Sequence, residues 1–118
     1  MLRILIADDD AEVRLALRIL LKSQSGLTLV GEAANALDLL KQIETEYPTV
    51  LILDWGLIAP APDILPGLRD RYPALRVIVI SGRAEVRAAA LNAGAEAFIS
   101  KGDPPDRLLM ALQKLRDA

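Results

Sequence analysis

The feature that most constrains the fold is a run of branched apolar residues, VLIL, that ends in a carboxylate at Asp54. A run this short and this rich in Val, Leu and Ile is typical of a strand buried on both faces, as in a parallel sheet. Three other segments, RILIADDD, RVIVIS and AFISK, also lead a strand-like run to a polar residue. Sites of open α/β sheets lie at the carboxyl ends of strands, so we expect these polar residues to share one edge of a sheet.

Size and composition narrow the kind of protein and the kind of chemistry. The chain of 118 residues has the size of one domain, which we expect to span residues 1–118. A hydrophobic content of 53% with 25% charged residues excludes a disordered chain. The sequence has no cysteine and no histidine, which excludes disulfides, thiolate nucleophiles and imidazole ligands. A bound metal would need oxygen ligands, which favours a hard cation such as Mg²⁺.

Charge and hydropathy indicate where the chain works and what it contacts. The net charge is −2 and no block of five or six like charges occurs, so we expect no contact with nucleic acid by this domain. The apolar start MLRILIA is too short for a signal peptide or a membrane span. We therefore expect a cytoplasmic location without membrane contact.

Strand-like and helix-like segments alternate along the whole chain. The expected strands cover residues 2–7, 27–31, 50–54, 75–80 and 97–100. Each is followed by a helix with a 3.6-residue apolar period. The expected N-caps are Asp10, Asn35, Asp63 and Asp103, and the expected stops are Gly26, Pro48, Pro73 and Gly94. This alternation predicts a flavodoxin-like, doubly wound α/β fold: a five-stranded parallel sheet of order 2-1-3-4-5 with five helices.

The predicted strand order brings five polar side chains to one place. Strands one and three become neighbours, so that Asp8, Asp9 and Asp54 converge, while strands four and five add Ser81 and Lys101. Three close carboxylates repel one another, and a bound Mg²⁺ ion would remove that conflict.

Each of these residues also has an ordinary explanation when it is taken alone. Asp10 is most simply a helix cap, and Asp8 or Asp9 could be a loop residue. Ser81 is typical of a turn and Lys101 of a solvated surface. Their coincidence at four strand ends favours a functional site.

The sequence resembles the receiver domain of two-component response regulators over its whole length, from ILIADDD through LILD and VIVIS to GAEAFISK. The segment LTLVGEAANALDLL and the Lys-Gly pair after the fifth strand are similar to receivers that precede helix-turn-helix output domains. One segment departs from the family: LIAPAPDI stands where Met-Pro and a later glycine are usual. The spacings between Asp54, Ser81 and Lys101 are also somewhat shorter than the family's.

The resemblance implies a role for each polar residue of the predicted site. Asp54 would be the phosphoacceptor. Asp8, Asp9, Asp54 and the backbone carbonyl of Gly56 would hold Mg²⁺, for which Mn²⁺ could substitute. Ser81 would hydrogen-bond the phosphoryl group.

The resemblance also implies a switch and a set of partners. Lys101 would pair with the phosphoryl group, and Phe98 would be the aromatic residue that reorients together with Ser81. The phosphoryl donor would be a sensor histidine kinase or a histidine phosphotransfer protein. The surface that changes would be the fourth expected helix, the fifth strand and the fifth expected helix, through which a homodimer could form. The chain would be no enzyme beyond catalysing its own phosphorylation and dephosphorylation.

Two other functions are compatible with the same fold. A pseudo-receiver would act as a protein-interaction module without phosphorylation; the altered LIAPAPDI segment favours it and the complete acidic set opposes it. A flavin or nucleotide binder is opposed by the lack of a glycine-rich phosphate loop after the first strand.

Overall fold

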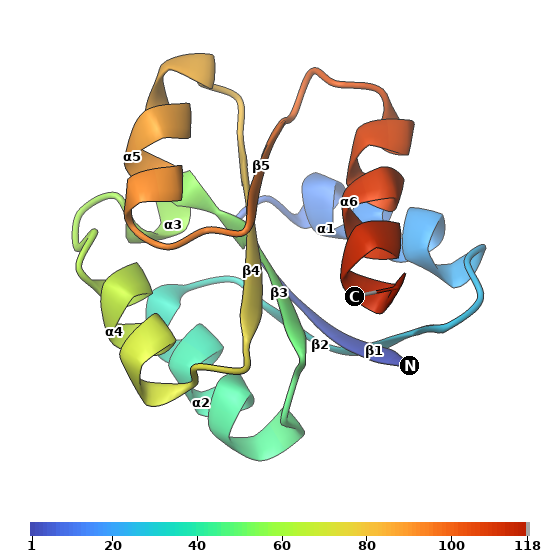
Figure 1. Cartoon of the computed structure of the whole chain (residues 1–118), viewed down its shortest axis with the longest axis horizontal. Coiled ribbons are helices and arrows are strands. Elements are labelled where there is room, and N and C mark those ends of the chain that lie inside the picture. Colours follow the sequence, from blue (N-terminus) through green and yellow to red (C-terminus); the bar gives the residue numbers. More distant parts are fainter. Residues whose placement is uncertain (118) are drawn as a thin grey trace.

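The fold is a five-stranded sheet with helices on both faces, described for residues 1–117 by a computed structural model (Figure 1). The elements in chain order are β1 (Leu2–Ala7), α1 (Ala11–Lys22), β2 (Leu27–Ala33), α2 (Ala36–Glu46), β3 (Val50–Asp54), α3 (Trp55–Ile58), α4 (Ile64–Arg71), β4 (Arg76–Ser81), η1 (Ala84–Val86), α5 (Arg87–Asn92), β5 (Ala97–Ser100) and α6 (Pro105–Asp117). All strand pairs are parallel and the order is β2-β1-β3-β4-β5, which confirms the predicted flavodoxin-like fold.

Two apolar clusters hold the layers together, one on each face of the sheet. Alternate residues of the central strands point to opposite faces, so that Leu51 belongs to one cluster and its neighbour Ile52 to the other. The face of Ile52 is covered by α1 and α6, and the face of Leu51 by α2 to α5 (Figure 1). β3 is buried along its whole length, as its uninterrupted apolar run predicts.

The register of the central strands aligns the polar residues that follow them. Ala7 of β1 pairs with Leu53 of β3, so the residues that come next, Asp8 and Asp54, lie at the same level. Asp54 in turn pairs with Ile80, the residue before Ser81. The expected convergence of strand ends is therefore present in the sheet.

The prediction of five helices is wrong, because the described residues form six α-helices and the short 3-10 helix η1. The third expected helix, after Asp63, is present as α4, and α3 is an additional helical turn that the sequence did not lead us to expect. α3 starts directly after Asp54 and ends after one turn, because Pro60 and Pro62 cannot continue it. The fourth expected helix corresponds to η1 and α5, and the fifth to α6.

Two predicted N-caps are confirmed and one carries no hydrogen bond. The side chain of Asp10 accepts from the backbone N–H of Glu12, and that of Asn35 accepts from the N–H of Asp38. Asp63 precedes α4, but its own backbone is helical, with φ −68° and ψ −10°, and its side chain makes no cap hydrogen bond. A capping side chain needs the extended backbone that Asp10 and Asn35 have.

Two further predicted boundaries are wrong. α6 begins at Pro105, and the Asp103 carboxylate accepts instead from the N–H of Ser100, 3.1 Å away, which places it in the turn before the helix. α1 ends at Lys22, so Gly26 lies beyond the helix; its φ of +80° serves the turn into β2.

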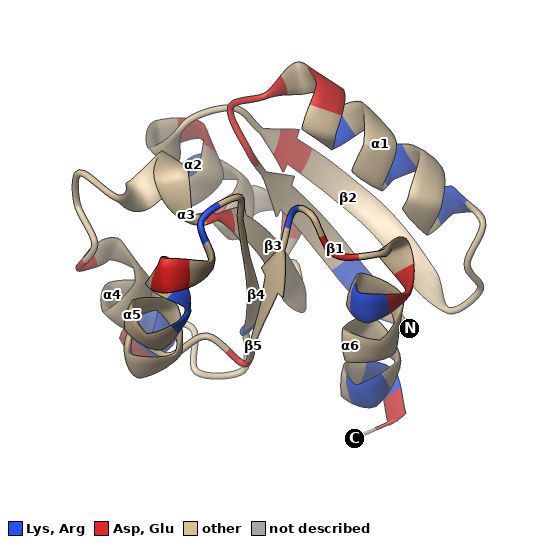
Figure 2. Ribbon diagram, turned by 90° about the horizontal axis from the view of Figure 1, so that it is seen from above, with Lys and Arg blue, Asp and Glu red and all other residues tan. Residues whose placement is uncertain are grey.

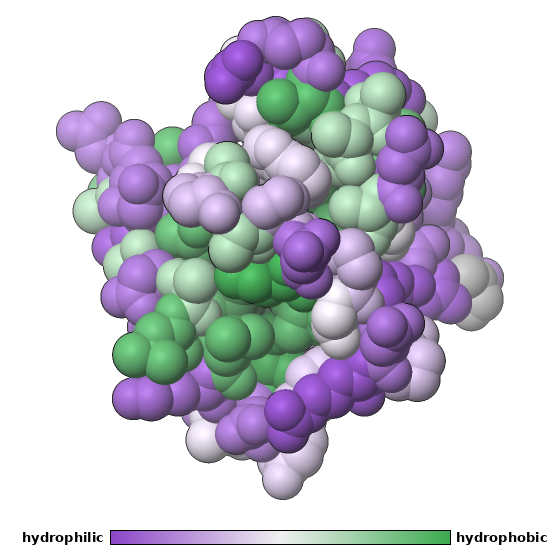
Figure 3. All heavy atoms as spheres, turned by 90° about the vertical axis from the view of Figure 1, so that its left-hand side faces the viewer, coloured by the Kyte–Doolittle hydropathy of each residue, from purple (hydrophilic) through white to green (hydrophobic). Residues whose placement is uncertain are grey.

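The strands and the surface add smaller differences. β2 extends to Ala33 and β4 covers Arg76–Ser81, each shifted slightly from its expected range. Apolar atoms reach the surface on the side that α2 to α5 form (Figure 3), and α2 itself exposes Leu37 and Leu40. Between residues 1 and 117, none of the helices combines the length and apolarity that a bilayer crossing requires.

Candidate functional site

Asp54 stands at the carboxyl end of the central strand and is 7% exposed. It is the residue before α3, but its side chain makes no cap hydrogen bond to that helix. The carboxylate lies at the edge of the sheet where the central strand ends. Gly56 lies directly beside it, since a Cβ on that glycine would stand 3.3 Å from Asp54 Oδ2.

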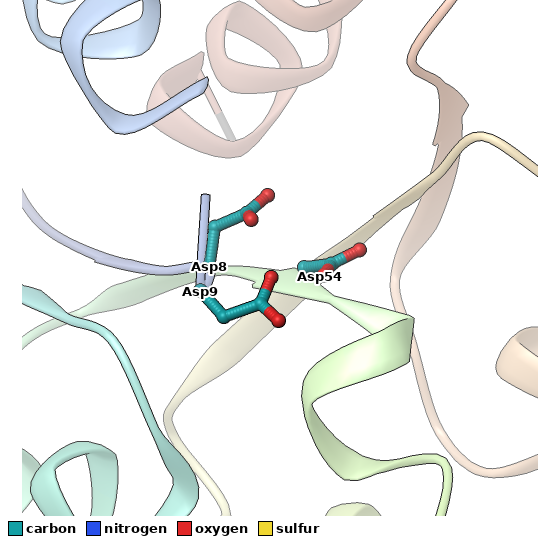
Figure 4. A group of neighbouring side chains, drawn as sticks. All are labelled: Asp8, Asp9 and Asp54. Atoms are coloured by element: carbon teal, nitrogen blue, oxygen red, sulfur yellow. The ribbon is translucent and has the colours of Figure 1, made fainter. Parts of the chain in front are cut away.

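Asp8 and Asp9 bring two more carboxylates to the same point. One carboxylate oxygen from each of Asp8, Asp9 and Asp54 lies within 4.8 Å of the others. Figure 4 shows the three side chains projecting into a common space, with Asp8 and Asp9 from the end of β1 and Asp54 from the end of β3. Asp8 is fully buried, whereas Asp9 is exposed, so the cluster opens to solvent on one side.

Lys101 supplies the positive charge at this edge. Its Nζ lies 3.0 Å from Asp8 Oδ2 and 3.3 Å from Asp54 Oδ1. The residue follows β5, and its backbone N–H donates to the Ser81 carbonyl at 2.8 Å. Figure 2 shows the acidic β1–α1 connection and the β5–α6 connection, which carries both a basic and an acidic stretch.

The surroundings shift the pKa values of two of these groups. Burial raises the pKa of Asp54, and the charge of Asp8 raises it further; contacts with Lys101 and the Gly56 backbone lower it without cancelling the rise. For Lys101, burial lowers the pKa, but its contacts with Asp8 and Asp54 outweigh burial and raise the pKa above its usual value. One lysine therefore does not neutralise the acidic cluster.

The cluster has the donors that a hard divalent cation requires. Asp8 Oδ1 accepts from the backbone N–H of Asp10 at 2.9 Å, whereas Asp8 Oδ2 is buried and accepts no hydrogen bond of good geometry from the described residues. The partner of Oδ2 is the Lys101 ammonium, 3.0 Å away, which also lies 3.3 Å from Asp54 Oδ1. A divalent cation would supply positive charge that this one shared lysine does not. The ligand atoms are carboxylate oxygens, two of them from fully or nearly buried residues, and such ligands fit Mg²⁺ or Mn²⁺. The residues present thus fit the predicted metal.

Ser81 and Phe98 lie where the topology predicts, on the two strands beyond Asp54. Ser81 is 5% exposed at the end of β4, and its hydroxyl accepts from the backbone N–H of Arg83 at 3.0 Å. Phe98 is buried in β5 opposite Val79, and the guanidinium carbon of Arg87 lies 6.0 Å from its ring centroid. These positions are compatible with the expected roles, which stay predictions.

Sequence reasoning missed Arg14 and Glu32. Arg14 Nη1 donates to the backbone carbonyl of Asp8 at 2.7 Å, and its Nε lies 3.6 Å from the Glu32 carboxylate on β2. The only sequence signal is that Arg14 occupies a polar position on α1 close after the acidic turn. That signal does not separate it from a solvated arginine.

The comparison with protein families decides what kind of domain carries this site. The family model described as "Response regulator receiver domain" matches residues 4–113. The chain belongs to the response regulator receiver family.

Curated relatives of this receiver domain are longer proteins. A protein-glutamate methylesterase/protein-glutamine glutaminase of Myxococcus xanthus is 39% identical over 106 residues, covering 85% of this chain and 30% of the relative. The transcriptional regulatory protein YhcZ of Bacillus subtilis is 32% identical over 117 residues, covering 95% of this chain and 54% of the relative. The receiver domain thus spans between about a third and a half of these relatives.

Solved structures show the same fold. The isolated receiver domain of RcsB from Salmonella enterica, determined with the phosphomimetic BeF3⁻, aligns with a TM-score of 0.91 at 23% identity, covering 99% of this chain and 89% of that one. The response regulator domain of Thermotoga maritima CheB aligns with a TM-score of 0.85 at 24% identity, covering 100% of this chain and 98% of that one.

Proposed function

We propose that this receiver domain accepts a phosphoryl group on Asp54 in a Mg²⁺-dependent reaction and passes the signal on through a change of surface. The observation that carries the proposal is the meeting of three carboxylates and Lys101 at the end of the central strand. Membership of the receiver family supports the same conclusion.

The proposed chemistry is an in-line phosphoryl transfer. A carboxylate oxygen of Asp54 attacks the phosphorus of a phosphohistidine, the P–N bond breaks, and the released imidazole takes a proton from solvent. Lys101, already 3.3 Å from Asp54 Oδ1, offsets charge on the transferred oxygens, and the Ser81 hydroxyl donates to one of them. Mg²⁺, held by Asp8, Asp9, Asp54 and the Gly56 carbonyl, supplies further charge neutralisation when it is bound.

The partners follow from this chemistry. The donor is a sensor histidine kinase or a histidine phosphotransfer protein, and the responding surface is that of α5, β5 and α6. Phosphorylation shifts the population toward a state in which Ser81 moves inward and Phe98 reorients. That surface then binds an output partner or a second copy of the chain. The chain catalyses only its own phosphorylation and dephosphorylation.

The test is the intact mass after incubation with acetyl phosphate and Mg²⁺. We expect a phosphoryl-sized increase in the wild type, its loss in Asp54→Asn, and its loss when EDTA replaces Mg²⁺. Asp63→Asn is the matched control, because Asp63 is an exposed aspartate without a cap hydrogen bond, and it should be labelled like the wild type.

Two results would contradict the proposal. Phosphoryl labelling that persists in Asp54→Asn would show that another residue is the phosphoacceptor. A wild type that takes up no phosphoryl group and binds no Mg²⁺ would favour the pseudo-receiver, which the altered LIAPAPDI segment that joins α3 to α4 supports.

A further inference from the structure

We propose that Arg14 is a positioning residue for the metal site: it holds the backbone of the β1–α1 turn so that Asp8 and Asp9 present their carboxylates to the cation. The inference deepens the proposed function and rests on it. It is carried by the contacts of Asp8 and by the support that Arg14 receives from β2.

Each polar atom of Asp8 has a partner in the protein. Its N–H donates to the Ala33 carbonyl at 3.0 Å, its Oδ1 accepts from the Asp10 N–H at 2.9 Å, and its carbonyl accepts from Arg14 Nη1 at 2.7 Å. The remaining atom, Oδ2, lies in the acidic cluster, 3.0 Å from Lys101 Nζ. Two side chains of other residues thus hold Asp8: Lys101 at the carboxylate and Arg14 at the backbone carbonyl.

The Asp8 carbonyl also sets the direction of Asp9. The carbonyl of Asp8 and the N–H of Asp9 belong to one planar peptide unit, so a partner that fixes the carbonyl fixes where the next residue begins. Asp9 is exposed and follows the buried Asp8 directly. Without Arg14, the turn could rotate this peptide, and the Asp9 carboxylate would swing away from the other two.

Arg14 is itself held in place from β2. Its Nε lies 3.6 Å from Glu32 Oε1, and both side chains are only 20% exposed. Arg18 donates two hydrogen bonds, of 2.6 and 2.9 Å, to the same carboxylate. The hydrogen bond from Arg18 lowers the pKa of Glu32, so its carboxylate stays charged. The order of contacts from the surface inward is Arg18, Glu32, Arg14 and the Asp8 carbonyl.

The sign of one measurement separates positioning from plain electrostatics. If Arg14 acted only as a positive charge near a cation site, its removal would strengthen Mg²⁺ binding, because like charges repel. If Arg14 positions the ligands, its removal weakens Mg²⁺ binding although a repelling charge is gone. Groups that orient metal ligands from outside typically change metal affinity by about 10- to 100-fold.

The experiment is a Mg²⁺ titration of the full chain, followed by the emission of Trp55 and by the rise in melting temperature. We expect Arg14→Gln to weaken Mg²⁺ binding about tenfold, and Arg18→Gln to weaken it less, because it removes a support one contact further out. The matched control is Arg71→Gln. Arg71 carries the same charge as Arg14, but its Nη2 pairs with Glu44 Oε1 at a distance of 2.9 Å, outside the acidic cluster. The Arg71→Gln variant should bind Mg²⁺ like the wild type.

The outcomes are distinguishable. Equal or tighter Mg²⁺ binding by Arg14→Gln overturns the inference and leaves the proposed function standing. A wild type that binds no Mg²⁺ overturns both. Far-UV circular dichroism reports whether each variant folds. If Arg14→Gln does not fold, Arg18→Gln is the test: weaker Mg²⁺ binding than the wild type supports the inference, and equal or tighter binding overturns it. An equal loss of affinity in Arg71→Gln would also overturn the inference.

Discussion

Two connections after the central strands deliver aspartates to one place by different means. The β1–α1 connection is held by local hydrogen bonds: Asp8 accepts from the Asp10 N–H, and Asp10 caps α1. The β3–α4 connection is longer and contains α3, and neither α3 nor α4 has a side-chain cap. It is anchored instead by the fully buried side chains of Ile58 and Leu65.

Local hydrogen bonds set the backbone path of the first connection, and tertiary packing sets that of the second. In the β1–α1 connection, Asp8 and Asp10 each accept a hydrogen bond from the backbone N–H two residues further on, so the shape follows from nearby residues. In the β3–α4 connection, the prolines interrupt a helix and apolar packing sets the path. We therefore expect polar substitutions to have large effects on the first connection and small effects on the second.

The largest expected effect is on metal binding by Asp8→Asn. The substitution keeps the shape of the buried side chain but removes a charged ligand. We therefore expect Mg²⁺ affinity to fall by about 100-fold or more, which exceeds the usual effect of residues that only orient the ligands. The Trp55 emission titration measures it. Asp63→Asn in the other connection should leave the affinity unchanged, and a comparable loss there would remove the distinction between the two connections.

The next effect concerns stability without metal. Because the pKa of Asp54 is raised in the folded state, ionising it costs stability, and this cost grows as pH rises through the folded-state pKa. Asp54→Asn should therefore be more stable than the wild type at pH 7 in EDTA, by about 1 kcal/mol, as is typical when one like-charge conflict is removed. The gain should vanish below about pH 4, where both proteins carry a neutral side chain.

Urea denaturation at several pH values measures this difference. A less stable Asp54→Asn at pH 7 would mean that the contact with Lys101 outweighs burial and the charge of Asp8.

The two helix starts allow a direct test of the comparison. Asp10→Ala removes a cap hydrogen bond from α1 and should cost about 1 kcal/mol of unfolding free energy. Asp63→Ala removes no cap hydrogen bond and should change stability by less than about 0.5 kcal/mol. Thermal or urea unfolding in EDTA distinguishes them. Equal losses would show that Asp63 caps α4 in solution.

The smallest effect is a gain of stability in α4. Gly67 lies inside this helix, is exposed, and has open space where a Cβ would stand. Gly67→Ala should therefore stabilise the domain by about 0.5–1 kcal/mol, because alanine loses less backbone entropy in a helix. Urea denaturation measures the change. A loss of stability would indicate that α4 needs a flexible position at Gly67.

Local patterns were sufficient wherever a residue's neighbours in sequence decide its structure. The apolar run before Asp54 predicts a buried parallel strand, and the alternation of strands and helices predicts the sheet order that is observed. The caps at Asp10 and Asn35 follow from side chains that reach N–H groups two or three residues away. The convergence of Asp8, Asp9 and Asp54 could be predicted for another reason: the sheet order makes β1 and β3 neighbours, and parallel strands end at one edge.

Other features depend on residues that are distant in sequence, and only the tertiary structure decided them. Whether a helix begins at Trp55 depends on how the segment before Pro60 packs over β3 and β4, which no local period encodes. α6 starts after Asp103 because the Asp103 carboxylate accepts a hydrogen bond from the backbone N–H of Ser100 and does not cap the helix. Arg14 became part of the site because α1 lies against β2, where Glu32 can hold it. A sequence pattern specifies what a side chain can bind, but packing decides which of several partners comes within 3 Å.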